Sequence, residues 1–582
     1  MKRKQRRARS THGTAIASGR ADALLGQIRH LFFEASEHEH AGKLELAART
    51  YKRVLALAPD QAQACNNLAR ALQGLGKLNE ASGFYARALA LMPQLLDQHS
   101  AILETLVSVL PPLGVAMRRQ MPAWPKRLGP QELFNEGLSS IAGDPLLHHV
   151  LQSTPVRDVA FERLLTSLRL SFLAKAARGE TFAEDNLAFV CALARQCFIN
   201  EYVFATTPEE EADAEDLKRA LTQAIEAGAP VEPSRIAVVA MYSPLHAVPA
   251  APRLLEMRWN PAIVKLLTQQ LREPEIERSL RSSIPRLTPI EDRTSQDVRR
   301  QYEESPYPRW VHAAGQVSPM PIDHYLREQF STSAFLPMRK TEQLDVLVAG
   351  CGTGQIAIAS AQKYSGARVL GIDLSLNSLC YAKRNTPATL AFRIEYAQAD
   401  ILELGSIDRS FDVIDSCGVL HHMSDPFKGW RILLDLLRPG GLMHIGLYSE
   451  AGRGDVSAAR EFIAAEGFGT TPAEIRRCRQ RLLETRFASV ARFTDFFTTS
   501  ECRDLLFHVR ETRVRIPAIA AFIAEHGLRF LGFEFAMPIL QRYRNHFASS
   551  GWSLTDLARW HAFESEHPET FSGMYQFWVQ RP

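Results

Sequence analysis

Three glycines at alternating positions and one acid stand where this chain could bind a nucleotide-like ligand. The run Leu344–Gly354 is an apolar, β-branched stretch that breaks into Gly350, Gly352 and Gly354, and Asp373 ends the next apolar run. Glycines let the backbone approach a ligand closely, and an acid at the end of a neighbouring strand can accept hydrogen bonds from both hydroxyls of a ribose. The pattern therefore predicts a site for a ligand that contains a nucleoside.

The spacing of the glycines separates two kinds of nucleotide site. A dinucleotide-binding turn reads G-x-G-x-x-G and holds a pyrophosphate at a helix N-terminus. The spacing here is G-x-G-x-G, which resembles motif I of the class I S-adenosylmethionine-dependent methyltransferases, whose ligand has no phosphate. A glycine triad by itself also fits an ordinary strand-to-helix turn, so the segments that follow decide between the two.

Those segments come in the order that a doubly wound α/β domain requires. We expect strands at 368–373, within 390–400 and from 411 onward, and then a helix end, a Pro-Gly-Gly turn and a fifth strand over 437–446. Residues 528–535 and 573–579 fit the last two strands, one of them paired antiparallel. Strands that alternate with helical stretches indicate a parallel sheet with the ligand at its carboxyl edge. The fold expected for the C-terminal part is a Rossmann-like α/β methyltransferase domain.

The resemblance implies roles for individual residues. Asp373 would hold the ribose, and Asp400 would meet the adenine amino group. The implied contacts to S-adenosyl-L-methionine are Gly350, Cys351, Gly352, Gly354, Asp373, Leu374, Asp400, Ile401, Cys417 and Tyr302, and no metal is implied. One position departs from the family, which often carries an acid two residues before the first glycine, where this chain has Val348. The methionine ammonium group would then need another partner.

A second motif precedes the glycine turn. The segment 298–310 contains Tyr302, Tyr307 and Trp310 together with two prolines, so we expect an extended segment or turn that presents the three rings. With the glycine motif, it resembles a family of bacterial tetratricopeptide-repeat methyltransferases, and the similarity extends from the repeats to the C-terminus. By that analogy the segment folds over the cofactor, where an aromatic face attracts the sulfonium. The alternative is a linker whose rings pack against the sheet.

Methyl transfer from a sulfonium requires mainly that the protein aligns the acceptor and excludes water. A general base is needed only where the acceptor is protonated at the working pH. His421 and His422 follow the fourth expected strand, and His421 is the candidate base; the alternative is that the pair makes local structural or cofactor-loop contacts. Neither Asn-Pro-Pro-Tyr nor Asp-Pro-Pro-Tyr occurs there, which by resemblance argues against methylation of an exocyclic base amine or a glutamine amide.

The N-terminal region repeats itself every 34 residues. Gly42, Ala47, Tyr51, Leu55 and Pro59 recur as Gly76, Ala81, Tyr85, Leu89 and Pro93. Thirty-four is the tetratricopeptide period, and such repeats are stable when stacked, so a helix over 95–110 is expected to cap them. The region either docks a protein or peptide partner, or serves as a scaffold or oligomer contact.

The expected division is a basic tail at 1–20, repeats with their cap at 21–110, a helical region at 111–285 and the methyltransferase domain at 286–582. Helices are expected at 159–173 and, buried all round, at 187–204. A helical insertion is expected at about 449–527. In it, a helix with Arg476, Arg477, Arg479 and Arg481 would present a solvated face, and Phe493, Phe496, Phe497 and 502–508 would form a lid or wall over the acceptor. Glu534 and His508 are further candidates for acceptor contacts, with surface roles as the alternative.

Composition bounds the class of protein. With 582 residues, 46% hydrophobic and 23% charged, the chain has the composition of a globular protein. No apolar run approaches the roughly 20 residues of a membrane span. Eight cysteines without a C-x-x-C pair indicate reduced thiols, no zinc site and a cytoplasmic location. Much of the net charge of +4 lies in Lys2–Arg9, which we interpret as a solvated tail, not a nucleic-acid surface.

The sequence thus predicts a cytoplasmic S-adenosylmethionine-dependent methyltransferase with an unidentified acceptor and helical repeats that recruit a protein partner. The alternative is a repeat-type interaction scaffold whose methyltransferase-like domain is weakly active or inactive. Val348 favours the scaffold, whereas the glycines, Asp373 and Asp400 favour the enzyme.

Overall fold

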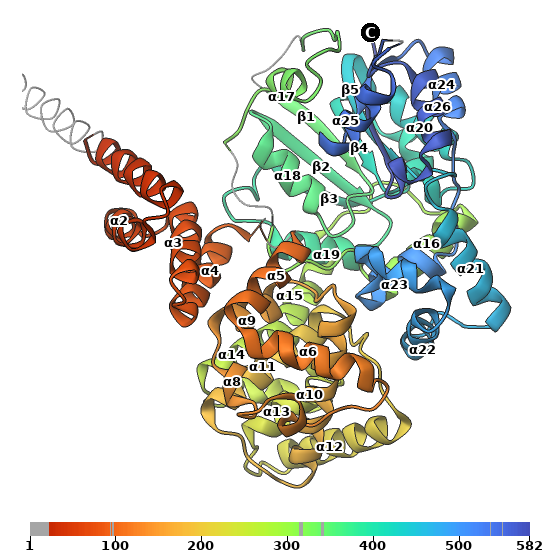
Figure 1. Ribbon diagram of the computed structural model, residues 1–582. Helices are drawn as coiled ribbons and strands as arrows, with labels where there is room; N and C mark the ends of the chain where they lie inside the picture. The colour runs from red at the N-terminus through yellow and green to blue at the C-terminus, as the bar shows by residue number, and fades with distance from the viewer. Residues whose placement is uncertain are drawn as a thin grey trace, which may run out of the picture. The chain divides into compact units, whose positions relative to one another are not determined.

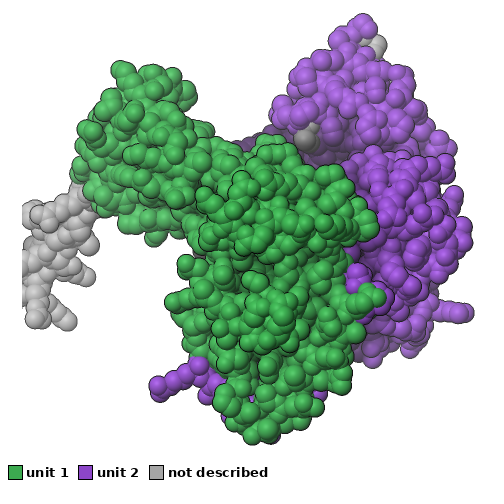
Figure 2. Space-filling model, turned by 60° about the horizontal axis from the view of Figure 1, so that its bottom comes forward, with its two compact units in different colours: residues 1–196, 209–242, 259–266 green, residues 197–208, 243–258, 267–582 purple. Residues whose placement is uncertain are grey.

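The computed structural model describes residues 23–93, 95, 98–313, 318–338, 343–535, 537–549 and 551–582, so the basic tail predicted at 1–20 lies outside the described residues. The chain divides into two compact units (Figure 2). Residues 1–196, 209–242 and 259–266 belong to the first unit, and residues 197–208, 243–258 and 267–582 belong to the second. Three segments of the helical region expected at 111–285 therefore belong to the C-terminal unit, namely 197–208, 243–258 and 267–285.

The first unit is built from helices (Figure 1). After a helical stretch at 23–40 come α2 (Leu44–Leu57), α3 (Ala62–Gly74), α4 (Leu78–Leu91), α5 (His99–Val109), α6 (Pro111–Ala123), α7 (Pro130–Leu133), α8 (Ser139–Ala142), α9 (Pro145–Ser153), α10 (Val159–Ala177), α11 (Glu184–Ile199), α12 (Pro208–Glu226), α13 (Pro233–Val239) and α14 (Pro261–Leu267). The helices expected at 159–173 and 187–204 are present as α10 and α11, although α11 ends at Ile199. Among the described residues, no single helix has the length and apolar composition to cross a membrane; α5 and α6 reach both only as a pair that is bent by 109°.

The 34-residue period of the sequence recurs in the structure of this unit. Gly42 and Gly76 each stand between two helices, with φ angles of 71° and 72°. These left-handed values favour glycine, which explains why both positions carry it. Ala47 and Ala81 are fully buried, so each helix that follows such a glycine packs closely on its neighbours.

Within the described residues, the second unit contains one seven-stranded sheet of order β3-β2-β1-β4-β5-β7-β6. Its strands are β1 (Leu344–Ala349), β2 (Ala367–Asp373), β3 (Ile394–Gln398), β4 (Phe411–Cys417), β5 (Leu437–Leu447), β6 (Arg529–Phe533) and β7 (Tyr575–Gln580). Strands β1 to β5 run parallel, and β7 is antiparallel to both β5 and β6. The expected doubly wound sheet with an antiparallel closing strand is confirmed.

Short helices make up the rest of this unit. They are η2 (Leu245–Ala247), η3 (Ala251–Glu256), η4 (Thr268–Arg272), α15 (Glu273–Leu280), η5 (Arg281–Ser283), α16 (Arg293–Glu304), α17 (Ile322–Gln329), α18 (Gln355–Lys363), α19 (Leu376–Asn385), η6 (Ile401–Ser406), η7 (Leu420–His422), α20 (Pro426–Asp435), α21 (Gly454–Glu466), α22 (Pro472–Leu483), η8 (Arg486–Arg492), η9 (Thr494–Phe496), α23 (Thr499–Phe507), α24 (Ile516–Glu525), α25 (Met537–His546), α26 (Leu557–Glu566) and η10 (Pro568–Phe571).

Helices cover both faces of the sheet (Figure 1), because successive strand residues point to opposite sides. In β1, Val346 and Val348 pack in one hydrophobic layer with residues of α18 and α19. Leu347 and Ala349 pack in the other layer with residues of α20, α24 and α26. The central strands are therefore buried on both faces, and their carboxyl edge remains for a ligand.

Two local expectations are wrong. Tyr302 lies on α16, which ends at Glu304, two residues before Pro306, so only Tyr307 and Trp310 stand on irregular backbone. The Pro-Gly-Gly sequence lies inside β5, where Phe411 pairs with Leu437 but Val413 pairs with Leu442. The Pro-Gly-Gly sequence is therefore a bulge that shifts the register of β5. It is not a turn before the strand, since β5 begins at Leu437.

The helix expected to present a solvated basic face is α22, and at Arg479 this expectation is also wrong. The Arg479 side chain is fully buried and donates hydrogen bonds to the main-chain oxygens of Phe496 (2.7 Å) and Val203 (3.1 Å). A buried guanidinium needs such acceptors, and the fold supplies them from η9 and from the distant segment 197–208, which the pattern of one helix cannot show.

Candidate functional site

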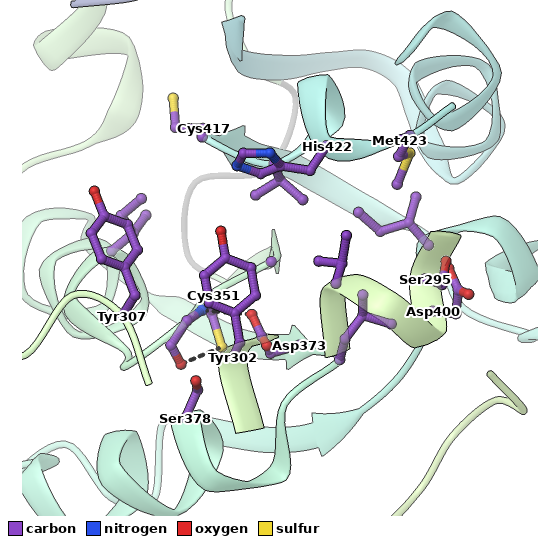
Figure 3. Close-up of a pocket in the computed structure, with 18 of the residues that line it drawn as sticks. Ser295, Tyr302, Tyr307, Cys351, Asp373, Ser378, Asp400, Cys417, His422 and Met423 are labelled. Atoms are coloured by element: carbon purple, nitrogen blue, oxygen red, sulfur yellow. Dashed lines mark hydrogen bonds between the residues drawn. The ribbon is translucent and has the colours of Figure 1, made fainter. Parts of the chain in front are cut away.

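A cavity of about 310 Å³ opens at the carboxyl edge of the sheet (Figure 3). Its wall comes from the turn after β1, the ends of β2 and β4, the start of η6 and one side of α16. Nine of the ten predicted cofactor contacts line it, namely Tyr302, Gly350, Cys351, Gly352, Asp373, Leu374, Asp400, Ile401 and Cys417. The tenth, Gly354, caps α18 and packs against Ala382.

The glycine turn brings bare backbone to this cavity. Gly350 and Gly352 have φ angles of 80° and 50°, which side chains rarely adopt. A Cβ atom on Gly352 would lie 2.8 Å from the main-chain oxygen of Tyr307, and one on Gly350 would lie 2.3 Å from Val419. Both positions therefore require glycine for their conformation and for their space.

The Asp373 carboxylate points at the same turn. Its Oδ2 accepts a hydrogen bond from the Gly352 N–H (2.9 Å), and its Oδ1 accepts one from the Ser375 N–H (2.8 Å). Burial raises the pKa of this carboxyl to about 6, although the backbone donors partly offset the shift. Each carboxylate oxygen keeps lone-pair capacity for another donor, such as a ribose hydroxyl.

Asp400 presents an unused acceptor. Its Oδ1 accepts from the Leu402 N–H (3.0 Å) at the start of η6, while its buried Oδ2 has no hydrogen-bond partner of good geometry among the described residues. Burial raises the pKa of the carboxyl, and Leu402 and the nearby Ser295 hydroxyl counteract the shift. Since a buried acceptor without a donor costs about 1–3 kcal/mol, this atom suits an incoming N–H donor such as an exocyclic amine.

Another part of the cavity is lined by rings. The Tyr302 hydroxyl donates to Asp504 (2.6 Å) and lies 3.2 Å from His508 Nε2. His422 also lines the cavity, and its Nδ1 lies 2.9 Å from the main-chain oxygen of Arg510. The His422 ring stacks on His508 with 3.6 Å between centroids. Asp504 and His508 come from α23 and its C-cap, so the insertion stands behind this wall.

His421 lies away from the cavity lining. It is fully buried, its ring stacks on Tyr448 with 3.7 Å between centroids, and burial lowers its pKa well below the usual value. The two histidines are adjacent in η7, and only the path of that turn decides which ring faces the cavity. Of the two candidate histidines, His422 therefore lines the cavity and His421 does not.

The remaining aromatic residues divide between wall and core. Tyr307 lines the cavity, whereas Trp310 packs on Tyr381 and donates from its indole nitrogen to Thr353. Phe496 and Phe497 are buried away from the lining, against Arg479. The expected lid from the insertion is thus wrong for these two phenylalanines, because they stabilise the buried guanidinium.

A second polar cluster stands behind Cys417. Asp415 and His444 are cross-strand neighbours in β4 and β5, and Asp415 Oδ2 lies 2.9 Å from His444 Nδ1. Although burial lowers it, Cys417 and Asp415 together raise the pKa of His444 well above its usual value. Glu534 approaches the other ring nitrogen at 3.8 Å. In the sequence, this cluster could have been found from one polar residue inside each of two apolar strands, Asp415 in β4 and His444 in β5.

Val348 occupies the position at which the resemblance would place an acid. Its side chain is 1% exposed and belongs to the hydrophobic layer under α18 and α19, so it does not line the cavity.

Comparisons with known proteins agree with this geometry. Residues 346–441 match the family model described as a methyltransferase domain. An "uncharacterized protein" of Synechococcus sp. is 29% identical over 263 residues, which cover 42% of this chain and 61% of that protein. The 27-O-demethylrifamycin SV methyltransferase of Amycolatopsis mediterranei is 36% identical over 115 residues, which cover 20% of this chain and 41% of the enzyme. This chain therefore spans less than two thirds of the length of either relative.

Among solved structures, PKMT2 from Rickettsia typhi in complex with AdoHcy is similar at 18% identity and a TM-score of 0.34, over 44% of this chain and 52% of that one. The family match covers β1 to the start of β5, the stretch that contains the glycine turn, Asp373 and Asp400. The stretch 346–441 of this chain is therefore similar to a methyltransferase domain.

Proposed function

We propose that this protein is an S-adenosylmethionine-dependent methyltransferase that holds its cofactor between the glycine turn and Asp373. The observation that carries the proposal is the Asp373 carboxylate, which is directed at the Gly352 N–H inside the cavity. Its oxygens would accept from the ribose hydroxyls, and the free Oδ2 of Asp400 would accept from the adenine amine. The bound cofactor supplies an activated methyl group.

The part of the protein in this reaction is to align the acceptor and exclude water. Tyr302 and Tyr307 line the cavity with their ring centroids 6.3 Å apart, and an aromatic face attracts a sulfonium. Alignment of this kind lowers a barrier by roughly 7–11 kcal/mol. We propose that Tyr302 and Tyr307 form the cover of the cofactor, while Trp310 anchors the segment to the domain.

Calorimetry with S-adenosylmethionine and S-adenosylhomocysteine tests the proposal. The Asp373→Asn variant removes the charge that accepts from the ribose and should weaken binding by about ten- to a hundredfold, since a hydrogen bond to a charged group contributes about 1.5–3 kcal/mol. The matched control is Asp408→Asn, because Asp408 is exposed and does not line the cavity. Affinity in the control should equal that of the wild type.

The rival proposal is an interaction scaffold whose methyltransferase-like domain is weakly active or inactive. The apolar, buried Val348 favours it, because the methionine ammonium then lacks its usual acid. Failure of the wild-type protein to bind either ligand at millimolar concentration would reject the enzyme in favour of the scaffold.

We further propose that the helix pairs of the first unit are tetratricopeptide repeats that recruit a protein acceptor or partner. Their support is the 34-residue period with matched glycine conformations at Gly42 and Gly76. Phe33 is 63% exposed on the helix at 23–40. If the repeats recruit the acceptor, Phe33→Glu should raise KM for a labelled macromolecular acceptor and leave cofactor affinity unchanged. Label that enters only small metabolites would reject recruitment.

A cytoplasmic location is part of the same proposal. Its support is the set of eight cysteines, all of them free thiols and seven of them buried. Thiols that stay unpaired agree with a reducing compartment. Fractionation of cells with an antibody to the chain tests it.

A further inference from the structure

An imidazole nitrogen without a partner faces the ring-lined part of the cavity. His422 lines the cavity, and Figure 3 shows its ring beside Tyr302. Its Nδ1 lies 2.9 Å from the main-chain oxygen of Arg510. Since a carbonyl oxygen only accepts, the ring proton is on Nδ1 and the free lone pair is on Nε2. The only side-chain hydrogen bond of His422 among the described residues is the one at Nδ1, so Nε2 makes none. Burial lowers the pKa of the ring, which keeps it neutral at neutral pH.

The surroundings fix this ring and its tautomer. His508 stacks on it with ring planes 18° apart, and His508 Nδ1 accepts from the Arg510 N–H (3.0 Å). The proton of His508 is therefore on Nε2, directed at the Tyr302 hydroxyl, which in turn donates to Asp504. The two main-chain groups of Arg510 thus set opposite tautomers in two neighbouring histidines, and only His422 keeps a free lone pair.

The charges around His422 do not reverse its neutrality. The titratable or charged groups that face it are His421, Tyr302, Tyr448, Arg453, Asp504, His508 and Glu511. Asp504 and Glu511 favour the protonated ring, but burial and Arg453 act in the opposite direction and prevail.

Other groups in the cavity wall are less suited to take a proton. Burial and Asp504 raise the pKa of the Tyr302 hydroxyl, so it stays a donor. Burial also raises the pKa of the Cys417 thiol to about 11. Asp373 and Asp400 are assigned to the ribose and adenine of the cofactor in the proposed function. His422 remains as the neutral acceptor of a proton.

The same side chains do not favour a metal ion. His422, Asp504 and His508 bring donor atoms within 4.8 Å of one another. However, the His422 and His508 rings lie nearly parallel at 3.6 Å, so their in-plane lone pairs run side by side and do not converge on one point. We therefore argue for a base and leave an ion as an outcome of the test.

We propose that His422 is the catalytic base for a phenolic hydroxyl acceptor, and that Arg510, His508, Tyr302 and Asp504 position it. This inference rests on the proposed methyltransferase function. An amine attacks through its own lone pair, whereas a hydroxyl becomes a strong nucleophile only when it loses its proton. The rings of Tyr302 and Tyr307 in the same wall suit an aromatic acceptor.

In the proposed step, the acceptor proton passes to His422 Nε2 and the acceptor oxygen bonds to the methyl carbon. The carbon–sulfur bond breaks, and its electron pair stays on the sulfur of S-adenosylhomocysteine. The proton then leaves His422 for solvent when the products depart.

The first test uses the cofactor-free protein and needs no turnover. With ¹⁵N-labelled histidine, the ring resonances that disappear in His422→Asn should report a neutral ring with its proton on Nδ1 at neutral pH. Asparagine suits this purpose because its amide can still donate towards the Arg510 oxygen while Nε2 is removed. A proton on Nε2, an imidazolium ring, or Zn²⁺ binding that disappears in this variant would overturn the assignment.

The second test measures methyl transfer to catechol and to 4-nitrophenol. His422→Asn should lower kcat with catechol by about a hundred- to ten-thousandfold, the usual contribution of general base catalysis. With 4-nitrophenol, which is more acidic and already largely ionised, the loss should stay below about tenfold. The wild-type rate should fall on the acid side as His422 protonates, whereas the rate of the variant should follow ionisation of the phenol. His324→Asn, on the exposed face of α17, is the control and should behave as wild type.

The outcomes separate the two proposals. An equal loss with both phenols, or no transfer to either phenol by wild-type protein that binds S-adenosylmethionine, would overturn the role of His422 and leave the cofactor site standing. If the cofactor does not bind, the proposed function fails, and this inference fails with it.

Discussion

The two ends of the cavity hold their polar groups in different ways. At one end, Asp373 and Asp400 are carboxylates, each bonded to backbone N–H groups and each with acceptor capacity left. At the other end, Tyr302, His422 and His508 are neutral groups. The Tyr302 hydroxyl lies against His508 Nε2, and both histidines contact the main chain of Arg510. A carboxylate end suits hydroxyl and amine donors that keep their protons, and a neutral end suits a group that gives one up.

The largest effect should come from filling the glycine turn. In Gly350→Val, the new side chain would meet Val419 at a backbone angle of φ 80° that valine rarely adopts. Strain of about 1–3 kcal/mol would add to loss of the space beside the turn, so cofactor affinity should fall by more than about a hundredfold. Calorimetry measures the loss, and near-wild-type affinity would show that the ligand does not use this turn.

The next prediction sharpens the carboxylate end. In Asp400→Asn, the amide can present an N–H group where Oδ2 was, so it should repel the adenine amine and attract a carbonyl. We expect binding of S-adenosylhomocysteine to weaken by about ten- to a hundredfold and binding of S-inosylhomocysteine to improve. Competition between the two ligands measures the ratio. An unchanged ratio would place the purine away from Asp400.

A pH titration tests the carboxylate end of the cavity without a mutation. Because burial raises the pKa of Asp373 to about 6, cofactor affinity should fall about tenfold at one pH unit below that value, where the carboxyl is protonated. The stability of the cofactor-free protein should run the other way. The contribution of the Asp373 carboxyl to the free energy of unfolding is fully present below its ordinary pKa of 3.8. It is lost as the pH rises through about 6. Parallel trends in affinity and stability would contradict the assignment.

The smallest effect on the cofactor should come from the ring-lined end. Tyr302→Phe removes the hydroxyl between Asp504 and His508 but keeps the ring, so cofactor affinity should change by less than about threefold while unfolding becomes easier by about 1–3 kcal/mol. Calorimetry and denaturant unfolding measure the two quantities. A large loss of affinity would mean that the Tyr302 hydroxyl, and not only its ring, contributes to cofactor binding.

The carboxylate end could be predicted from the sequence because its parts are local. Gly350 and Gly352 follow a strand directly, Asp373 ends the next strand, and the order of strands then places them at one edge. The ring-lined end could not be predicted in this way. Tyr302 reaches Asp504 across 202 residues and His508 across 206. No spacing rule connects such positions.

The sequence by itself determined the parallel strands, the glycine turn and the two acids, since alternation along a strand and the left-handed angles of glycine depend on near neighbours. Only the tertiary structure decided that Tyr302 stands on a helix, that His422 and not His421 faces the cavity, and that Arg479 is buried. The direction of a side chain after a strand ends, and the acceptors that let a charge be buried, depend on what distant segments pack against it.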